Sequence, residues 1–209
     1  MMNRRKLTLC AVLAAGVLAM GIGGYRLYRD ASEIYDNTIR LHVLAASDGK
    51  RDQSLKLTVR DALVDEVAIL TEGASDKGES EAILQENIHY LTQIAKETLE
   101  REGCAEDVEI TLTTEYYPTR DYDGLRLPAG EYTSMQVKIG AAEGKNWWCV
   151  LFPPVCTSSA RAEEAMAQTG FSKSQIRLLT QEEDPTYTVK FRVVEQFAKI
   201  KRSLKELFR

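Results

Sequence analysis

The segment that decides the fold covers residues 39–70 and reads IRLHVLAASDGKRDQSLKLTVRDALVDEVAIL. In its first seven residues an apolar side chain recurs at every second position, which is the period of a β-strand with one face on a core. After a turn at residues 47–49, apolar residues recur every four positions, which predicts a helix from about residue 52 to residue 70. Asp48 or Asp52 is placed to cap this helix. The core-facing residues are Ile39, Leu41, Val43 and Ala45 in the strand and Leu55, Val59, Leu63 and Val67 in the helix.

The rest of the pattern predicts a second helix from about residue 80 to Gly103, then several strands and a terminal amphipathic helix. We expect strands over residues 108–112, 132–139, 147–152 and 186–191, a long loop over 116–130 and loosely ordered chain over 157–180. The strand at 147–152 is apolar on both sides, so it suits the middle of a sheet or an edge that meets a partner. This order of elements predicts an α+β single domain, with helices packed on a mixed or antiparallel sheet.

The N-terminal segment has the pattern of an export signal. Arg4, Arg5 and Lys6 precede an uncharged stretch of 19 residues from Leu7 to Tyr25. As a helix this hydrophobic stretch is about 28 Å long, marginal for a bilayer core of about 30 Å and long for a cleaved signal. We therefore expect residues 1–24 to be a signal peptide or a signal anchor, residues 25–37 a linker and residues 38–209 the α+β domain. The basic residues ahead of the stretch place the domain across the membrane from the cytoplasm.

The composition restricts the function classes. Of 209 residues, 44% are hydrophobic and 28% are charged, as in a globular protein and unlike a disordered or polytopic membrane protein. The net charge is -4, and the first 24 residues hold basic but no acidic side chains, so the domain is more acidic than the whole chain. An acidic domain argues against nucleic acid as a partner, because phosphate binding needs a basic face.

Three of the four cysteines lie in the domain. Cys149 and Cys156 enclose Val-Leu-Phe-Pro-Pro-Val, in which the two prolines can turn the chain back on itself. The spacing favours a structural disulfide between them, which would stabilise the domain by about 2–3 kcal/mol. Two free buried thiols are the alternative. If the disulfide forms, Cys104 is left unpaired.

Catalytic and metal chemistry find little support in the sequence. Neither His42 nor His89 has a second ligand at metal spacing, and no glycine-rich phosphate loop follows a strand, so we expect no metal and no cofactor. One catalytic arrangement is conceivable, with Cys149 as nucleophile, His42 as its base and Asp48 orienting the base. It would make the chain an exported Cys/His hydrolase that acts on cell wall or small esters. Against it, Cys149 lies in an apolar run, where burial without a cationic partner makes a thiol inert.

Two segments are candidates for partner binding. Tyrosine and arginine, which are enriched at binding hot spots, gather between residues 116 and 126; tyrosines that only pack on the sheet are the alternative. The C-terminal helix carries a basic face, which suits an anionic membrane or an acidic partner, or else a core-packed helix with a solvated face. The first set is Tyr116, Tyr117, Arg120, Tyr122 and Arg126, and the second is Arg192, Lys199, Lys201, Arg202, Lys205 and Arg209.

Three segments together resemble the stage II sporulation protein R family. They are residues 39–61, residues 117–132, and residues 146–156, which read NWWCVLFPPVC and are the most specific. The resemblance covers about residues 38–200, including residues 189–195, and departs from the family at Ala46 and Val155, where Asn and Leu are expected. The first segment supplies the family-motif residues His42, Ser47, Asp48, Arg60 and Asp61.

The resemblance implies an intercellular signal of endospore formation. Such proteins are made in the forespore, exported into the space between forespore and mother-cell membranes, and regarded as activators and not as enzymes. They trigger a membrane-embedded aspartic protease, stage II sporulation protein GA, which processes the precursor of sigma-E in the mother cell. We expect contact with this protease through an arginine and aromatic surface made of Arg120, Tyr122, Trp147 and Trp148.

Overall fold

The computed structural model describes residues 4–122, 125–154, 159–180, 192–196, 199–200, 203 and 207. The fold class is α+β, as predicted, with a mainly antiparallel sheet and helices packed on it. In chain order the elements are α1 (Arg4–Asp36), β1 (Ile39–Leu44), α2 (Lys50–Leu70), α3 (Lys77–Glu86), α4 (Ile88–Arg101), β2 (Val108–Tyr117), β3 (Arg120–Tyr122), β4 (Leu125–Leu127), β5 (Gly130–Ile139), β6 (Asn146–Phe152), α5 (Ser159–Gln168) and α6 (Lys173–Thr180).

The main sheet has the strand order β2-β5-β1-β6. Strand β1 runs parallel to β5 and antiparallel to β6, and β2 runs antiparallel to β5, so the sheet is mixed. The alternating strand predicted from residues 39–45 is therefore an inner strand with neighbours on both sides. Of the two places considered for the apolar strand at 147–152, β6 occupies the edge of the described sheet.

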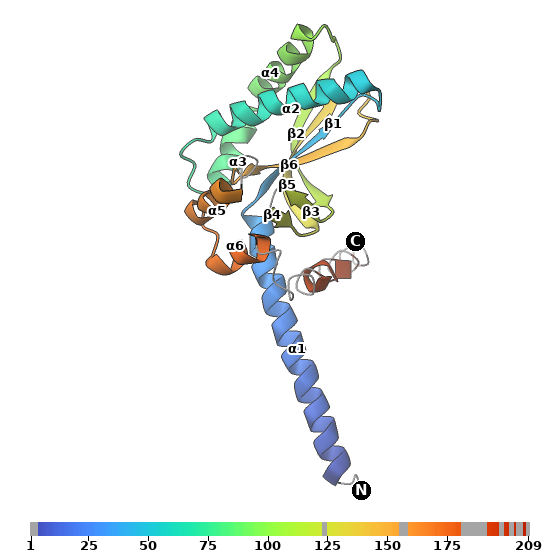
Figure 1. Cartoon of the computed structure of the whole chain (residues 1–209), viewed down its shortest axis with the longest axis vertical. Helices are drawn as coiled ribbons and strands as arrows, with labels where there is room; N and C mark the ends of the chain where they lie inside the picture. The colour runs from blue at the N-terminus through green and yellow to red at the C-terminus, as the bar shows by residue number, and fades with distance from the viewer. Residues whose placement is uncertain are drawn as a thin grey trace.

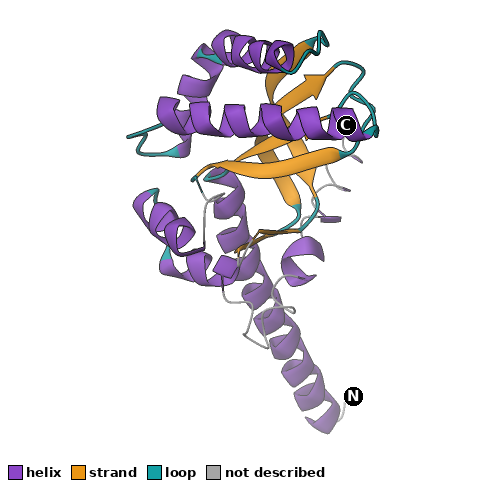
Figure 2. Cartoon of the chain, turned by 45° about the horizontal axis from the view of Figure 1, so that its top comes forward, coloured by secondary structure: helices purple, strands orange, loops and turns teal. Residues whose placement is uncertain are grey.

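One face of this sheet packs against α2 and α4, and Figure 2 shows the long α2 lying across the strands. The alternation in β1 buries Ile39, Leu41 and Val43, while the four-residue stripe of α2 buries Val59 and Leu63. Each such side chain stabilises the fold by about 1.5–3 kcal/mol. The predicted core faces of both elements are confirmed.

The helices differ in detail from the prediction. The second helix is two helices, α3 and α4, which meet at Asn87. Helix α2 begins after Gly49 with no side-chain cap, so the predicted capping role of Asp48 or Asp52 is wrong. Gly103 ends the predicted span in the left-handed region, with φ of +67°, where glycine carries no steric penalty.

A smaller apolar cluster lies at the other end of the sheet, between the β3–β4 hairpin, α5, α6 and the end of α1. Two predictions fail here: residues 116–130 contain the end of β2 and this hairpin in place of a long loop, and residues 157–180 contain two helices. The buried residues of this smaller cluster are Ile34, Leu125, Leu127, Val150, Ala162, Met166, Phe171, Leu178 and Leu179. The expected strand at 186–191 lies outside the described residues, while residues 192–196 of the expected terminal helix are helical.

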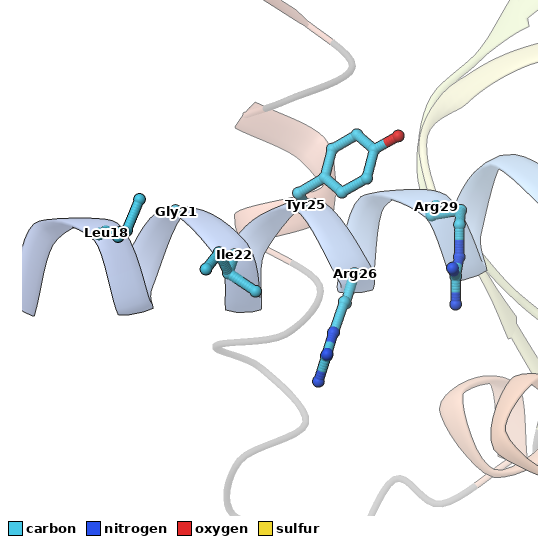
Figure 3. A pocket seen from close by; sticks show the side chains of 6 residues that line it. All are labelled: Leu18, Gly21, Ile22, Tyr25, Arg26 and Arg29. Atoms are coloured by element: carbon cyan, nitrogen blue, oxygen red, sulfur yellow. The ribbon is translucent and has the colours of Figure 1, made fainter. Parts of the chain in front are cut away.

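Helix α1 extends away from the domain as a rod with the N-terminus at its far end (Figure 1). Residues 25–36, expected to be a linker, form its last turns, and Tyr35 donates a hydrogen bond to the Ala129 carbonyl at 2.9 Å. In the part of the chain that the structure describes, no helix has the length and apolar character that crossing a membrane requires. Figure 3 shows residues of α1 that line a pocket, and their side chains change from apolar to basic near Tyr25: Leu18, Gly21, Ile22, Tyr25, Arg26 and Arg29.

Candidate partner-binding site

The face of the sheet opposite α2 and α4 carries a cluster of polar and aromatic side chains. Side chains alternate along a strand, so Arg40 and His42 point away from the face that Leu41 buries. The strand register places His42 beside Gln136 of β5 and Trp148 of β6. Arg40 lies beside Ser134 of β5. Residues from three neighbouring strands, β1, β5 and β6, therefore meet on this face.

Glu115 of β2 is the acceptor at the centre of this face. Its carboxylate receives hydrogen bonds from the Ser134 hydroxyl and from Gln136 Nε2 at 2.6 Å, and its Oε1 lies 2.9 Å from His42 Nδ1. Burial by itself raises the pKa of Glu115, but the bonds from His42, Ser134 and Gln136 prevail and hold this pKa below its usual value. His42 Nε2 lies 2.9 Å from Asn146 Oδ1, so both ring nitrogens of His42 are engaged.

Arg40 is fully buried within a cage of three tyrosines. Its guanidinium carbon lies 4.1 Å from the ring centroid of Tyr117, 4.9 Å from that of Tyr132 and 5.5 Å from that of Tyr122. Burial raises the pKa of Tyr117 and Tyr132, so these rings stay neutral and their faces stabilise the charge of Arg40, for which no described residue supplies an anion. Arg40 Nη2 donates to the Tyr122 hydroxyl, while Nε and Nη1 have no hydrogen-bond acceptor among the described residues.

The four residues predicted to bind a partner fall into separate surroundings. Arg120 lies 3.9 Å from the ring centroid of Trp148, so these two are in direct contact. Tyr122 contacts Arg40 beneath them. Trp147 is 39% exposed and points to the opposite side of β6, where Arg60 of α2 lies 4.5 Å from its ring centroid. Binding by these residues remains a prediction.

The family-motif residues Ser47 and Asp48 hold the turn between β1 and α2 against the connection between β5 and β6. Asp48 Oδ1 accepts a hydrogen bond from the Lys145 backbone at 2.7 Å, and the Gly144 backbone donates to the Ala45 carbonyl at 2.9 Å. A Cβ at Gly144 would lie 2.3 Å from the Ser47 carbonyl oxygen, so only glycine fits this approach. The other motif residues, Arg60 and Asp61, form an ion pair on α2, which holds Arg60 near Trp147.

The conceivable catalytic arrangement of Cys149, His42 and Asp48 is not assembled. Cys149 is disulfide-bonded and lies beside Leu41, on the face of the sheet opposite His42, and Asp48 bonds to the Lys145 backbone. The predicted disulfide partner, Cys156, lies outside the described residues, and Cys104 is a free thiol. Within the described part of the chain, no cluster of three or more His, Cys, Asp or Glu side chains could hold a metal ion.

Sequence reasoning missed most of the cluster around Arg40 and Glu115. Arg40 in β1 and Ser134 in β5 alternate with the core residues, as exposed polar side chains do, so the sequence pattern does not show that both are buried on the other face. A buried arginine between apolar neighbours needs a partner, but the sequence does not show which distant strand supplies it.

Comparison of the sequence with known proteins identifies a family. The family model described as stage II sporulation protein R matches residues 35–162, which contain the six strands of the described part of the chain. The chain is 37% identical to Stage II sporulation protein R of Bacillus subtilis (strain 168) over 123 residues, which are 59% of this chain and 55% of that protein. The match thus spans little more than half of that relative. No solved structure matches the chain. This chain belongs to the stage II sporulation protein R family.

Proposed function

We propose that this chain is an exported signalling protein of endospore formation that activates the membrane-embedded aspartic protease of the pro-sigma-E pathway. The single observation that carries the proposal is the family match over residues 35–162, which includes the whole sheet and the Arg120–Trp148 contact. The disulfide at Cys149 adds support, because disulfides persist in compartments outside the reducing cytosol.

Activation without catalysis requires a shift between two states of the protease. A ligand can switch an enzyme only if it binds the active arrangement more tightly than the inactive one. A change from 1% to 99% active requires about 5.5 kcal/mol of differential affinity. Arginine and aromatic side chains such as Arg120 and Trp148 are residue types that supply binding energy on this scale.

Export follows from the same proposal. Residues 1–24 carry the domain across the forespore membrane, as a cleaved signal peptide or as a retained anchor, and the domain meets the external face of the protease. Stage II sporulation protein GA is the partner that the family resemblance implies. Neither a nucleic acid nor a cofactor takes part.

Co-expression tests the proposal in a bacterium that lacks the pathway. The membrane protease and the sigma-E precursor are expressed with or without this chain, and cleavage of the precursor is followed by immunoblot. We expect cleavage only when all three are present, and much weaker cleavage with Arg120→Ala than with the control Arg126→Ala, which removes the same charge from the same hairpin.

An uncut precursor, in cells whose secreted chain is folded and abundant, would refute activation. Cleavage by the chain in the absence of the protease would refute the non-catalytic role.

A further inference from the structure

Two arginines, Arg40 and Arg120, lie on the same side of the β3–β4 hairpin as Tyr122. Arg120 and Tyr122 are two positions apart in β3, so their side chains leave the strand on the same face. Arg40 approaches from β1 and donates to the Tyr122 hydroxyl through Nη2. Burial raises the pKa of Tyr122, and the positive charges of Arg40 and Arg120 oppose that rise. The positive charges of two arginines therefore act on the Tyr122 hydroxyl.

Neither of these arginines has an acidic partner among the described residues. By contrast, Arg126 pairs with Asp121 at 3.0 Å on the same hairpin. Glu115, a carboxylate of this face, is already engaged by His42, Ser134 and Gln136. Among the described residues, Nε and Nη1 of Arg40 and Nε of Arg120 are buried without a hydrogen-bond acceptor. Nε of Arg126 makes no hydrogen bond of good geometry either, but it faces the Asp121 carboxylate.

Such an arrangement is costly in the free protein. Buried charges are normally paired, because loss of hydration is repaid only by an opposite charge or by hydrogen bonds. Contact with aromatic ring faces offsets part of this desolvation cost for both arginines. An anion placed at Tyr122 would supply the rest.

We infer that Arg120, Tyr122 and Arg40 form a binding site for a carboxylate carried by an acidic segment of the protein partner. Arg120 lies against Trp148 and can direct its in-plane N–H groups at both oxygens of a carboxylate. The Tyr122 hydroxyl accepts from Arg40 and so keeps its own hydrogen for donation. Arg40 strengthens the site from beneath through its charge, without touching the ligand.

A polypeptide carboxylate fits this site better than a free phosphate. The arginine pairs here with the indole of Trp148, and a tryptophan beside an arginine is typical of protein-binding hot spots. The identity of the partner as the protease rests on the proposed function, whereas the chemistry of the site does not.

Titration of the full chain in a neutral detergent tests the site. With ¹⁵N-labelled tryptophan, the two indole N–H signals are assigned by Trp147→Phe, and Trp147 serves as an internal reference. The probes are a glycine-flanked peptide with two glutamates, the same peptide with glutamines, and inorganic phosphate. We expect the glutamate peptide to shift the Trp148 signal saturably, with little change at Trp147, and the other two probes to have much weaker effects.

Variants locate the binding groups. Arg120→Gln and Tyr122→Phe should each weaken the glutamate peptide about tenfold or more, because each removes a hydrogen bond to a charged group. Arg126→Gln removes the same charge as Arg120→Gln and should leave the affinity within about twofold, since Arg126 is already paired. Arg120→Gln and Arg126→Gln leave the buried Arg40 and its hydrogen bond to Tyr122 in place, so both are expected to fold.

Equal responses to the glutamate and glutamine peptides would overturn the inference. So would a phosphate response as strong as that of the glutamate peptide, or equal losses for Arg120→Gln and Arg126→Gln. Because the titration contains no protease, a chain that binds the peptide but fails to activate proteolysis refutes the proposed function alone. A chain that activates proteolysis but ignores the peptide refutes this site alone.

Discussion

Replacing Glu115 with alanine should destabilise the fold strongly, although Glu115 lies on the sheet face away from the main core. The side chain of Glu115 is 19% exposed, and its carboxylate accepts from Ser134, Gln136 and His42. Alanine leaves these three groups without their acceptor. A buried donor without a partner costs about 1–3 kcal/mol, and water at this partly open site recovers some of that cost, so we expect a loss of about 3 kcal/mol.

The same strand provides a matched control. Glu109 is also a glutamate of β2 that faces β5, but it is exposed, and its carboxylate lies 3.5 Å from Lys138 Nζ. Surface ion pairs contribute about 0–1 kcal/mol, so Glu109→Ala should change stability little.

Urea unfolding of the full chain, followed by tryptophan fluorescence, measures both free energies of unfolding. If Glu115→Ala costs less than about 1 kcal/mol and matches Glu109→Ala, the hydrogen-bond network does not stabilise the fold, and the reasoning about this face is wrong.

Three further predictions concern the pH dependence of stability, the turn at Gly144 and the packing of α1. The pKa of Glu115 is lower in the folded than in the unfolded chain, so the ionised carboxylate stabilises the fold above pH 4.5, and this stabilisation is lost as the pH falls through the lowered pKa. In a pH series of urea midpoints, Glu115→Gln should reduce the loss of stability at acid pH, and an unchanged dependence of the midpoint on pH would contradict the assignment. Gly144→Ala should lower the free energy of unfolding by about 1–3 kcal/mol, because the added Cβ meets the Ser47 carbonyl, whereas Gly23 has open space around it and Gly23→Ala should be neutral or stabilising. Equal thermal midpoints for the two variants would refute the close approach at Gly144. Ile34→Ala should cost about 2–5 kcal/mol and the exposed Ile22→Ala almost nothing, and indistinguishable unfolding curves would show that α1 does not pack on the domain.

The sequence predicted those elements whose apolar period persists over enough residues. Strand β1 and helix α2 show a clear two-residue and four-residue repeat, and both bury the expected face. Strand β5 likewise buries Met135, Val137 and Ile139. In each case one core imposes a single regular pattern on one element.

Short elements escaped prediction because they show too few periods. Strands β3 and β4 have three residues each, and α6 has eight, so no repeat stands out from a mixed composition. Their burial depends on Ile34 at the end of α1, a residue whose packing no local pattern indicates.

The candidate site was predicted only in part. Residue types predict Arg120, Tyr122, Trp147 and Trp148, and the structure brings Arg120 and Trp148 into contact but places Trp147 beside Arg60 on the other side of β6. Arg40 could not be added, because its link to Tyr122 joins residues 82 positions apart, and only the sheet register shows which strands supply its cage.

The central claim is that the domain acts from outside the cell as a ligand of the protease. Addition of the purified full chain in mild detergent to protoplasts that express the protease and the sigma-E precursor tests it most directly. The account predicts dose-dependent cleavage of the precursor inside these cells and none in protoplasts without the protease. An unprocessed precursor at every dose, with protoplasts that bind the folded chain, would contradict it.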